Sequence, residues 1–172
     1  MQQTLQPLSM IYNEKSGFHS AKNDEVYEQL MTYWSDCGFE IQVFDIASEN
    51  DISILINKVK QRHQSKDNHG VIVAAGGDGT LNAVASQLLH QDIPMGIIPL
   101  GTFNNVERVL DIPIEVMAAA EVIAKEQPRK IHVAKINEHI YLNNESLGIY
   151  PLFIEKRELY NQKFGRFPLH AY

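Results

Sequence analysis

Short apolar runs alternate along the chain with longer stretches in which apolar residues recur at helical spacing. The apolar runs predict strands at Leu8 to Tyr12, Phe39 to Phe44, Val71 to Ala75 and Met95 to Pro99. The helical stretches predict helices at about Val26 to Cys37, Ile52 to Val59, Thr80 to His90 and Pro113 to Lys125. Strands that alternate with helices are typical of a parallel sheet covered by helices, so the pattern predicts an α/β fold.

Signals at the ends of these elements sharpen the prediction. Gly38 follows the first helical stretch and Asp51 precedes the second, as is typical of a helix end and a helix start. Pro113 suits the first turn of the last helix. The uninterrupted apolar run VIVAA, which begins at Val71, suits a central strand buried on both faces. We therefore expect a Rossmann-like parallel sheet with helices on both faces over residues 1–127.

The pattern changes after residue 128. Lys130 to Ile136 and His139 to Asn143 predict two strands joined by a short turn, which is a hairpin rather than another strand and helix unit. We assign residues 128–172 to a second unit that this hairpin opens. Because an isolated two-stranded unit is rarely stable in water, we expect self-association through this region, which would make the chain a homo-oligomer.

Composition and charge narrow the classes of function. The 172 residues are 44% hydrophobic and 21% charged, which describes a folded globule with a real core. A count of 15 Lys and Arg against 21 Asp and Glu gives a net charge of -6, so we expect no nucleic-acid partner. Cys37 is the single cysteine, which leaves neither a disulfide nor a thiolate metal site within the chain. The opening residues lack the pattern of a signal peptide and no apolar run could span a bilayer, so we expect a cytoplasmic protein.

Several catalytic and nucleotide motifs are absent from the sequence. The histidines are scattered without an HExxH spacing, which makes a zinc site improbable. No GxSxG elbow is present, so nothing indicates a serine hydrolase. Neither the P-loop pattern GxxxxGK[ST] nor the dinucleotide pattern GxGxxG occurs.

Three polar loops each follow a predicted strand. They are NEKSG from Asn13 to Gly17, GGDGT from Gly76 to Thr80, and LGTFNN from Leu100 to Asn105. In a parallel sheet with right-handed crossovers, all loops that follow strands lie at the same edge. The sequence therefore predicts a ligand site at that edge, on the convergence of the three loops.

The GGDGT loop has the composition of a phosphate site. Its three glycines can take positive φ and let the backbone approach a ligand, while the N–H groups at the start of the next helix favour an anion. Asp78 would repel that anion unless a metal ion or a hydroxyl proton lies between them, which indicates magnesium-nucleotide chemistry or activation of an attacking hydroxyl. The alternative is that Asp78 only fixes the turn or caps the helix. Lys15 of the first loop could also meet the phosphate charge.

The third loop and the C-terminal segment leave two interpretations each. Thr102, Asn104 and Asn105 offer neutral donors to a ligand, or they form the capped start of a short helix from Asn104 to Leu110. Residues 151–172 carry four basic and two acidic side chains among aromatic ones. This segment fits a patch that touches anionic membrane or, as we prefer, a partly packed and solvated face.

The three loops together are recognisable. The strings IYNEKSG, GGDGTLNAV and PLGTFNNVER resemble the catalytic domain of the diacylglycerol kinase family, which includes bacterial lipid kinases and sphingosine kinases and is related to NAD kinase. YLNNESLGIYP and GRFP are similar to a bacterial branch whose third motif also reads GTFN. The resemblance runs from about residue 9 to the C-terminus.

The resemblance implies ATP-dependent phosphorylation of a lipid alcohol such as diacylglycerol, with Mg²⁺ as a further cofactor and with peripheral contact at the inner membrane face. In the family, ATP lies between an α/β domain and a C-terminal β-sandwich, of which our hairpin would be the opening part. Asp78 would be catalytic. The implied nucleotide contacts are Asn13, Glu14, Lys15, Ser16, Gly17, Ser48, Gly76, Gly77, Asp78, Gly79, Thr80, Leu81, Asn82 and Thr102.

The sequence departs from the family at three points. Glu14 stands where proline is usual and adds a negative charge beside the expected phosphates. Asn105 stands where many members have aspartate. Most of the family's β-sandwich, with its general base and magnesium ligands, would lie beyond residue 172. We therefore expect the nucleotide-binding part of a lipid kinase, with a non-catalytic nucleotide-binding module and an NAD kinase as the alternatives.

Overall fold

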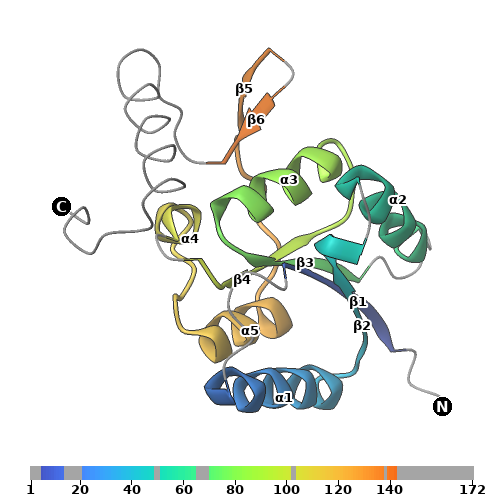
Figure 1. Cartoon of the computed structure of the whole chain (residues 1–172), viewed down its shortest axis with the longest axis vertical. Coiled ribbons are helices and arrows are strands. Elements are labelled where there is room, and N and C mark those ends of the chain that lie inside the picture. Colours follow the sequence, from blue (N-terminus) through green and yellow to red (C-terminus); the bar gives the residue numbers. More distant parts are fainter. Residues whose placement is uncertain are drawn as a thin grey trace, which may run out of the picture.

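The structure is a computed structural model that describes residues 5–13, 21–48, 51–64, 70–101, 104–137 and 139–142. Its centre is a sheet of four parallel strands in the order β2-β1-β3-β4 (Figure 1). The strands are β1 (Gln6–Tyr12), β2 (Phe39–Asp45), β3 (Val71–Gly76) and β4 (Met95–Pro99). Each of them contains the apolar run that predicted it, so the parallel α/β fold is confirmed.

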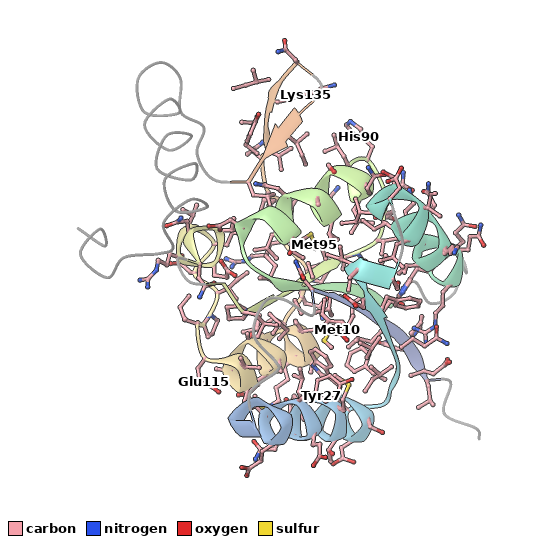
Figure 2. All side chains as sticks on the ribbon, viewed as in Figure 1. Met10, Tyr27, His90, Met95, Glu115 and Lys135 are labelled. Atoms are coloured by element: carbon pink, nitrogen blue, oxygen red, sulfur yellow. The ribbon has the colours of Figure 1, made fainter. Side chains whose placement is uncertain are left out.

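Helices cover both faces of this sheet, as predicted. On one face lie α1 (Ala21–Asp36) and α5 (Val116–Lys125), and on the other lie α2 (Ile52–Arg62) and α3 (Asp78–Leu88) (Figure 1). Two short helices complete this part, namely the 3-10 helix η2 (Ile46–Ser48) and α4 (Asn105–Val109). Figure 2 shows Met10 on the α1 and α5 side of the sheet, where its side chain is fully buried.

The central strand β3 holds the two faces together. All six of its residues are buried, because neighbouring strands flank it on both sides and helices cover both of its faces. Val73 and Ala75 join the core beneath α1 and α5, whereas Ile72 and Ala74 join the core beneath α2 and α3. An uninterrupted apolar sequence is what such a strand requires.

The strand order creates a switch point between β1 and β3. The chain leaves β1 toward α1 on one face, and it leaves its neighbour β3 toward α3 on the opposite face. The two connections therefore diverge at the carboxyl ends of adjacent strands. In open α/β sheets, this divergence opens the crevice in which ligands bind.

The helix boundaries follow their capping groups, and two predictions were wrong here. Pro113 lies before α5 rather than in its first turn, because the carboxylate of Glu115 caps that helix by accepting from Met117 N at 3.0 Å and Ala118 N at 2.6 Å. Helix α3 spans Asp78–Leu88, so it begins and ends earlier than the predicted range. The predicted ends at Gly38, with φ of 88°, and Asp51, which accepts from Ser53 N at 2.7 Å, are confirmed.

The hairpin is present and docks on α3. Its strands β5 (Ala134–Ile136) and β6 (His139–Tyr141) are antiparallel, and they are shorter than predicted because the residues from Lys130 to Val133 are not in strand conformation. Leu142 N, just after β6, donates to Asn82 Oδ1 of α3 at 3.0 Å. In Figure 1 the hairpin lies beyond α3, away from α1, and Figure 2 shows Lys135 on its outer part.

Figure 2 shows Glu115 at the start of α5. Removal of this capping carboxylate should destabilise the helix. We expect Glu115→Ala to lower the free energy of unfolding by about 1 kcal/mol, because two helix N–H groups lose their acceptor. Urea denaturation followed by circular dichroism measures the change. Glu121→Ala is the matched control, since the exposed pair of Glu121 with Lys125 on the same helix is worth only about 0.3–0.5 kcal/mol. Equal losses in the two variants would contradict the capping role.

Candidate functional site

A cleft of about 420 Å³ lies at the switch point. The end of β1, the segment from η2 to α2, and the first turns of α3 form its walls. The lining residues are Asn13, Ile46, Ile52, Gly77, Asp78, Gly79, Thr80 and Ala83. The cleft is therefore at the sheet edge where the sequence predicted a ligand site, and two of the three predicted loops contribute to it.

The GGDGT loop turns directly from β3 into α3. Gly76 is the last residue of β3, and Gly77 is the extended N-cap of α3 with φ of -94° and ψ of -178°. Thr80 N and Leu81 N both donate to Gly77 O, at 2.9 and 3.1 Å. The amides of Asp78 and Gly79 come before these first bonded amides, so the open end of the helix faces the cleft.

The glycines of this loop serve close packing rather than unusual backbone geometry. None of Gly76, Gly77 and Gly79 has positive φ, which corrects the prediction made for them. A Cβ on Gly76 would lie 2.6 Å from Thr80 Oγ1, so the turn itself excludes a side chain there. A Cβ on Gly79 would meet nothing within 4 Å, which means that open space lies beside this residue.

The third loop touches the second through another glycine. A Cβ on Gly101 would lie 2.7 Å from Gly77 Cα and 2.8 Å from Asn104 Oδ1. Leu100 N also donates to Gly76 O at 3.1 Å. The two loops are therefore in backbone contact, so a change in the conformation of one would displace the backbone of the other.

Asp78 caps a helix, but not its own. Its Oδ1 accepts from Val106 N at 3.2 Å, and its Oδ2 accepts from Asn105 Nδ2 at 3.2 Å. The carboxylate at the start of α3 thus holds the start of α4 while it also lines the cleft. This arrangement corrects the alternative in which Asp78 caps the helix that contains it.

The predicted short helix after the third loop is present as α4, although its cap differs from the prediction. Asn104 stands at the N-cap position with left-handed φ of 49° and ψ of 49°, and its side chain makes no capping bond. The residue is only 7% exposed, and its Oδ1 has no hydrogen-bond partner. One amide at the start of α4, Val106 N, instead donates to Asp78 from the other loop.

Glu107 is a residue that the sequence analysis missed. It lies in α4 with no exposed surface, and neither of its carboxylate oxygens has a hydrogen-bond partner. Burial raises the pKa of the Glu107 carboxyl above its ordinary value of 4.5 by more than the residue's own backbone N–H lowers it, and the charge of Asp78 raises the pKa further. The signal that could have revealed it is an acidic residue directly after buried Val106, in a short helix that follows a ligand loop.

None of the remaining predicted contacts that the structure describes lines the cleft. Leu81 is buried in the core, and the side-chain oxygen of Asn82 accepts a hydrogen bond from Leu142 N. Ser48 is exposed at the end of η2, where its Oγ donates to Asp45 O at 2.6 Å, and it does not line the cleft. Glu14 to Gly17 and Thr102 lie outside the described residues, as does the basic segment after Pro151.

Within the described part of the chain, no group of three or more His, Cys, Asp or Glu side chains could hold a metal ion. No helix among the same residues is both long and apolar enough to cross a bilayer.

The buried carboxyl of Glu107 should make stability depend on pH. Between the ordinary value of 4.5 and the raised pKa of Glu107, the folded chain holds a proton that the unfolded chain releases, so stability falls as pH rises through this window. We expect Glu107→Gln to remove that fall and to be more stable than the wild type by about 1–3 kcal/mol at about pH 8. Urea midpoints from about pH 4 to 8 measure the difference.

The control for this comparison is Glu126→Gln, which removes one charge from an exposed position. A gap between Glu107→Gln and the wild type that stays constant over the whole pH range would show that Glu107 does not titrate as its burial implies.

Comparison with known families matches residues 7–136 to the diacylglycerol kinase catalytic domain. A diacylglycerol kinase of Staphylococcus haemolyticus (strain JCSC1435) is 30% identical over 136 residues, which are 78% of this chain and 39% of that protein. A diacylglycerol kinase of Staphylococcus aureus (strain bovine RF122 / ET3-1) is also 30% identical over 136 residues, with 78% of this chain and 41% of that protein covered. The chain thus spans about two fifths of the length of these curated relatives.

Among solved structures, a diacylglycerol kinase from Bacillus anthracis str. Sterne has a TM-score of 0.62 at 21% identity, over 81% of this chain and 46% of that one. At this identity the likeness shows the fold, and it agrees with the parallel sheet described above. The family match extends over most of the chain and includes the sequences of all three predicted loops. This chain belongs to the diacylglycerol kinase catalytic domain family.

Proposed function

We propose that this chain is the ATP-binding part of a kinase that transfers phosphate to the hydroxyl of a lipid alcohol such as diacylglycerol. The observation that carries the proposal is the open start of α3 in the switch-point cleft, with free space beside Gly79. Family membership supports the reaction class. The relatives named as diacylglycerol kinases support the choice of lipid, and the remainder of the catalytic machinery would come from further chain.

The triphosphate would lie against the first turn of α3. The amides of Asp78 and Gly79 and the positive end of the helix dipole provide an anion site that needs no basic side chain. The absence of a side chain at Gly79 lets the phosphate oxygens approach the backbone. The fit of ATP therefore rests on backbone geometry that the structure describes.

The nucleoside would take the apolar side of the same cleft. Ile46 and Ile52 come from the segment between β2 and α2, and Ala83 lies one turn along α3 from Gly79. These side chains are only partly buried, so a planar ring that packs on them would remove apolar surface from water. Asn13, at the end of β1, is the polar group on that side of the cleft.

Asp78 would act on the acceptor side of the reaction. In the ligand-free chain, bonds to Val106 N and Asn105 Nδ2 hold the carboxylate beside the cleft. From there it can turn to orient a hydroxyl that attacks the transferred phosphoryl group. Mg²⁺ carried by the triphosphate would reduce the repulsion between the phosphates and this carboxylate. We assign no residue of this chain as a ligand of that ion.

Gly79→Ala separates the fold from the phosphate site. A methyl group at this position meets no protein atom within 4 Å, and alanine favours a helix, so the free energy of unfolding should stay equal or rise by up to about 1 kcal/mol. The methyl group would instead occupy the space of the ligand, and we expect the affinity for ATP·Mg²⁺ to fall about tenfold or more. Isothermal titration calorimetry measures the affinity.

The matched control is Ser86→Ala, an exposed position on the same helix that does not line the cleft. This variant should bind ATP·Mg²⁺ as the wild type does. Failure of the folded wild type to bind the nucleotide would remove the proposed function, and normal binding by Gly79→Ala would remove the phosphates from the start of α3.

The proposal for partners includes peripheral membrane contact and a second copy of this chain. Within the described residues, Ile131 and Ile136 are 47% and 40% exposed at the hairpin. We expect self-association that weakens when both are replaced by serine, because the replaced side chains can no longer bury apolar surface. Sedimentation velocity at rising concentration measures the effect, and a monomer at high concentration would contradict it.

A further inference from the structure

Helix α4 carries the residues of a second cap that is not formed. Asn104 stands at its N-cap position and Glu107 at the third helical position, which is the spacing of a capping box. In a closed box, the Asn104 side chain accepts from the N–H of Glu107, and the Glu107 carboxylate accepts from the N–H of Asn104. Both bonds are local, so the start of α4 could be capped without any help from α3.

In the structure neither side chain makes its capping hydrogen bond. Asn104 Oδ1 and both carboxylate oxygens of Glu107 are buried without a hydrogen-bond partner. These are three of the four such side-chain atoms found among the described residues, and they all lie within one turn of chain. A buried acceptor that lacks a donor is costly, so the concentration of three at one helix start calls for an explanation.

The conformation of Asn104 explains why the box is open. A residue whose side chain caps a helix has extended backbone angles, but Asn104 is left-handed with φ of 49°. Asp78 holds the two residues that follow it, through Val106 N and Asn105 Nδ2, and so fixes the turn in this shape. The left-handed Asn104 found together with the Asp78 cap is therefore incompatible with the local box, which needs extended backbone at Asn104.

We propose that Glu107 is a positioning residue for Asp78: together with Asn104 it forms a local cap that takes over the start of α4 when Asp78 turns to a bound ligand. The exchange lets Asp78 leave Val106 N while the start of α4 gains a bond at the N–H of Glu107 in place of the one lost at Val106 N. It also gives donors to Asn104 Oδ1 and to one of the two Glu107 carboxylate oxygens. The identity of the ligand rests on the proposed function, whereas the exchange of caps can be tested without any ligand.

The exchange would affect the cleft through the contact between Gly101 and Gly77. Asn104 Oδ1 and Gly77 Cα both pack against Gly101. A Cβ placed on Gly101 would lie 2.8 Å from the first atom and 2.7 Å from the second. When Asn104 changes from the left-handed to the extended conformation, its side chain leaves Gly101.

The ligand-free test removes the Asp78 cap. In Asp78→Ala, NMR-detected amide exchange should show the Glu107 amide protected about five- to tenfold more than in the wild type, since a closed cap is worth about 1 kcal/mol. The Val106 amide, which loses its acceptor, should exchange faster. The amides of Met117 and Ala118 serve as the internal control, because their cap comes from Glu115.

A second pair of variants distinguishes a positioning role from simple packing. In the Asp78→Ala background, Glu107→Gln should retain the protection, because glutamine also closes the box, whereas Glu107→Leu should lose it while it keeps the position apolar and filled. An unchanged or faster Glu107 amide in Asp78→Ala overturns the proposal. If Asp78→Ala does not fold, Asp78→Leu, which keeps the volume but offers no acceptor to Val106 N, gives the same decision through the carbon shifts of Asn104, since these shifts distinguish left-handed from extended backbone.

The ligand arm separates this proposal from the proposed function. Saturation of the wild type with ATP·Mg²⁺ should reproduce the protection at Glu107 that Asp78→Ala shows without ligand. Calorimetric binding without that change would overturn the exchange and leave the nucleotide site intact. No binding would overturn the nucleotide site, and the ligand-free variants would still decide whether the local cap forms.

Discussion

The hydrogen bond between Asp78 and Val106 N is the interaction on which the candidate site depends. It joins the first turn of α3 to the first turn of α4, across a distance of 28 residues in the sequence. The contact between Gly77 and Gly101 then brings the backbones of the two loops together beneath it. Without these contacts, the second and third loops would share a sheet edge but not a common geometry.

This bond also sets the electrostatics of the sheet edge. The carboxylate of Asp78 is directed toward donors of α4, so the start of α3 keeps its own amides available to the cleft. Glu107 lies nearby in a fully buried position, where burial and the charge of Asp78 raise its pKa and favour the uncharged acid. Two carboxyl groups can therefore stand close together because only one of them must carry its charge.

The sequence predicted the strands well and the details of the site poorly, for one physical reason. A strand such as β3, buried on both faces, requires an apolar run that any reader of the sequence can see. The convergence of the loops follows from topology once the strands are placed. The partners of Asp78 and Asn82, by contrast, lie 28 and 60 residues away, and only the packed fold brings them together. The local sequence allowed α5 to begin either at Pro113 or after Glu115, and it did not show which of these starts forms.

Helix α3 connects the cleft to the hairpin as well as to α4. Its first turn carries Gly79 and Asp78, and Asn82, one turn further along, accepts from Leu142 N after β6. An α-helix of this length moves as a rigid body, so a shift of its first turn is transmitted to the hairpin. Any segment that follows β6 would thus start from a position fixed by the same helix whose first turn lines the cleft.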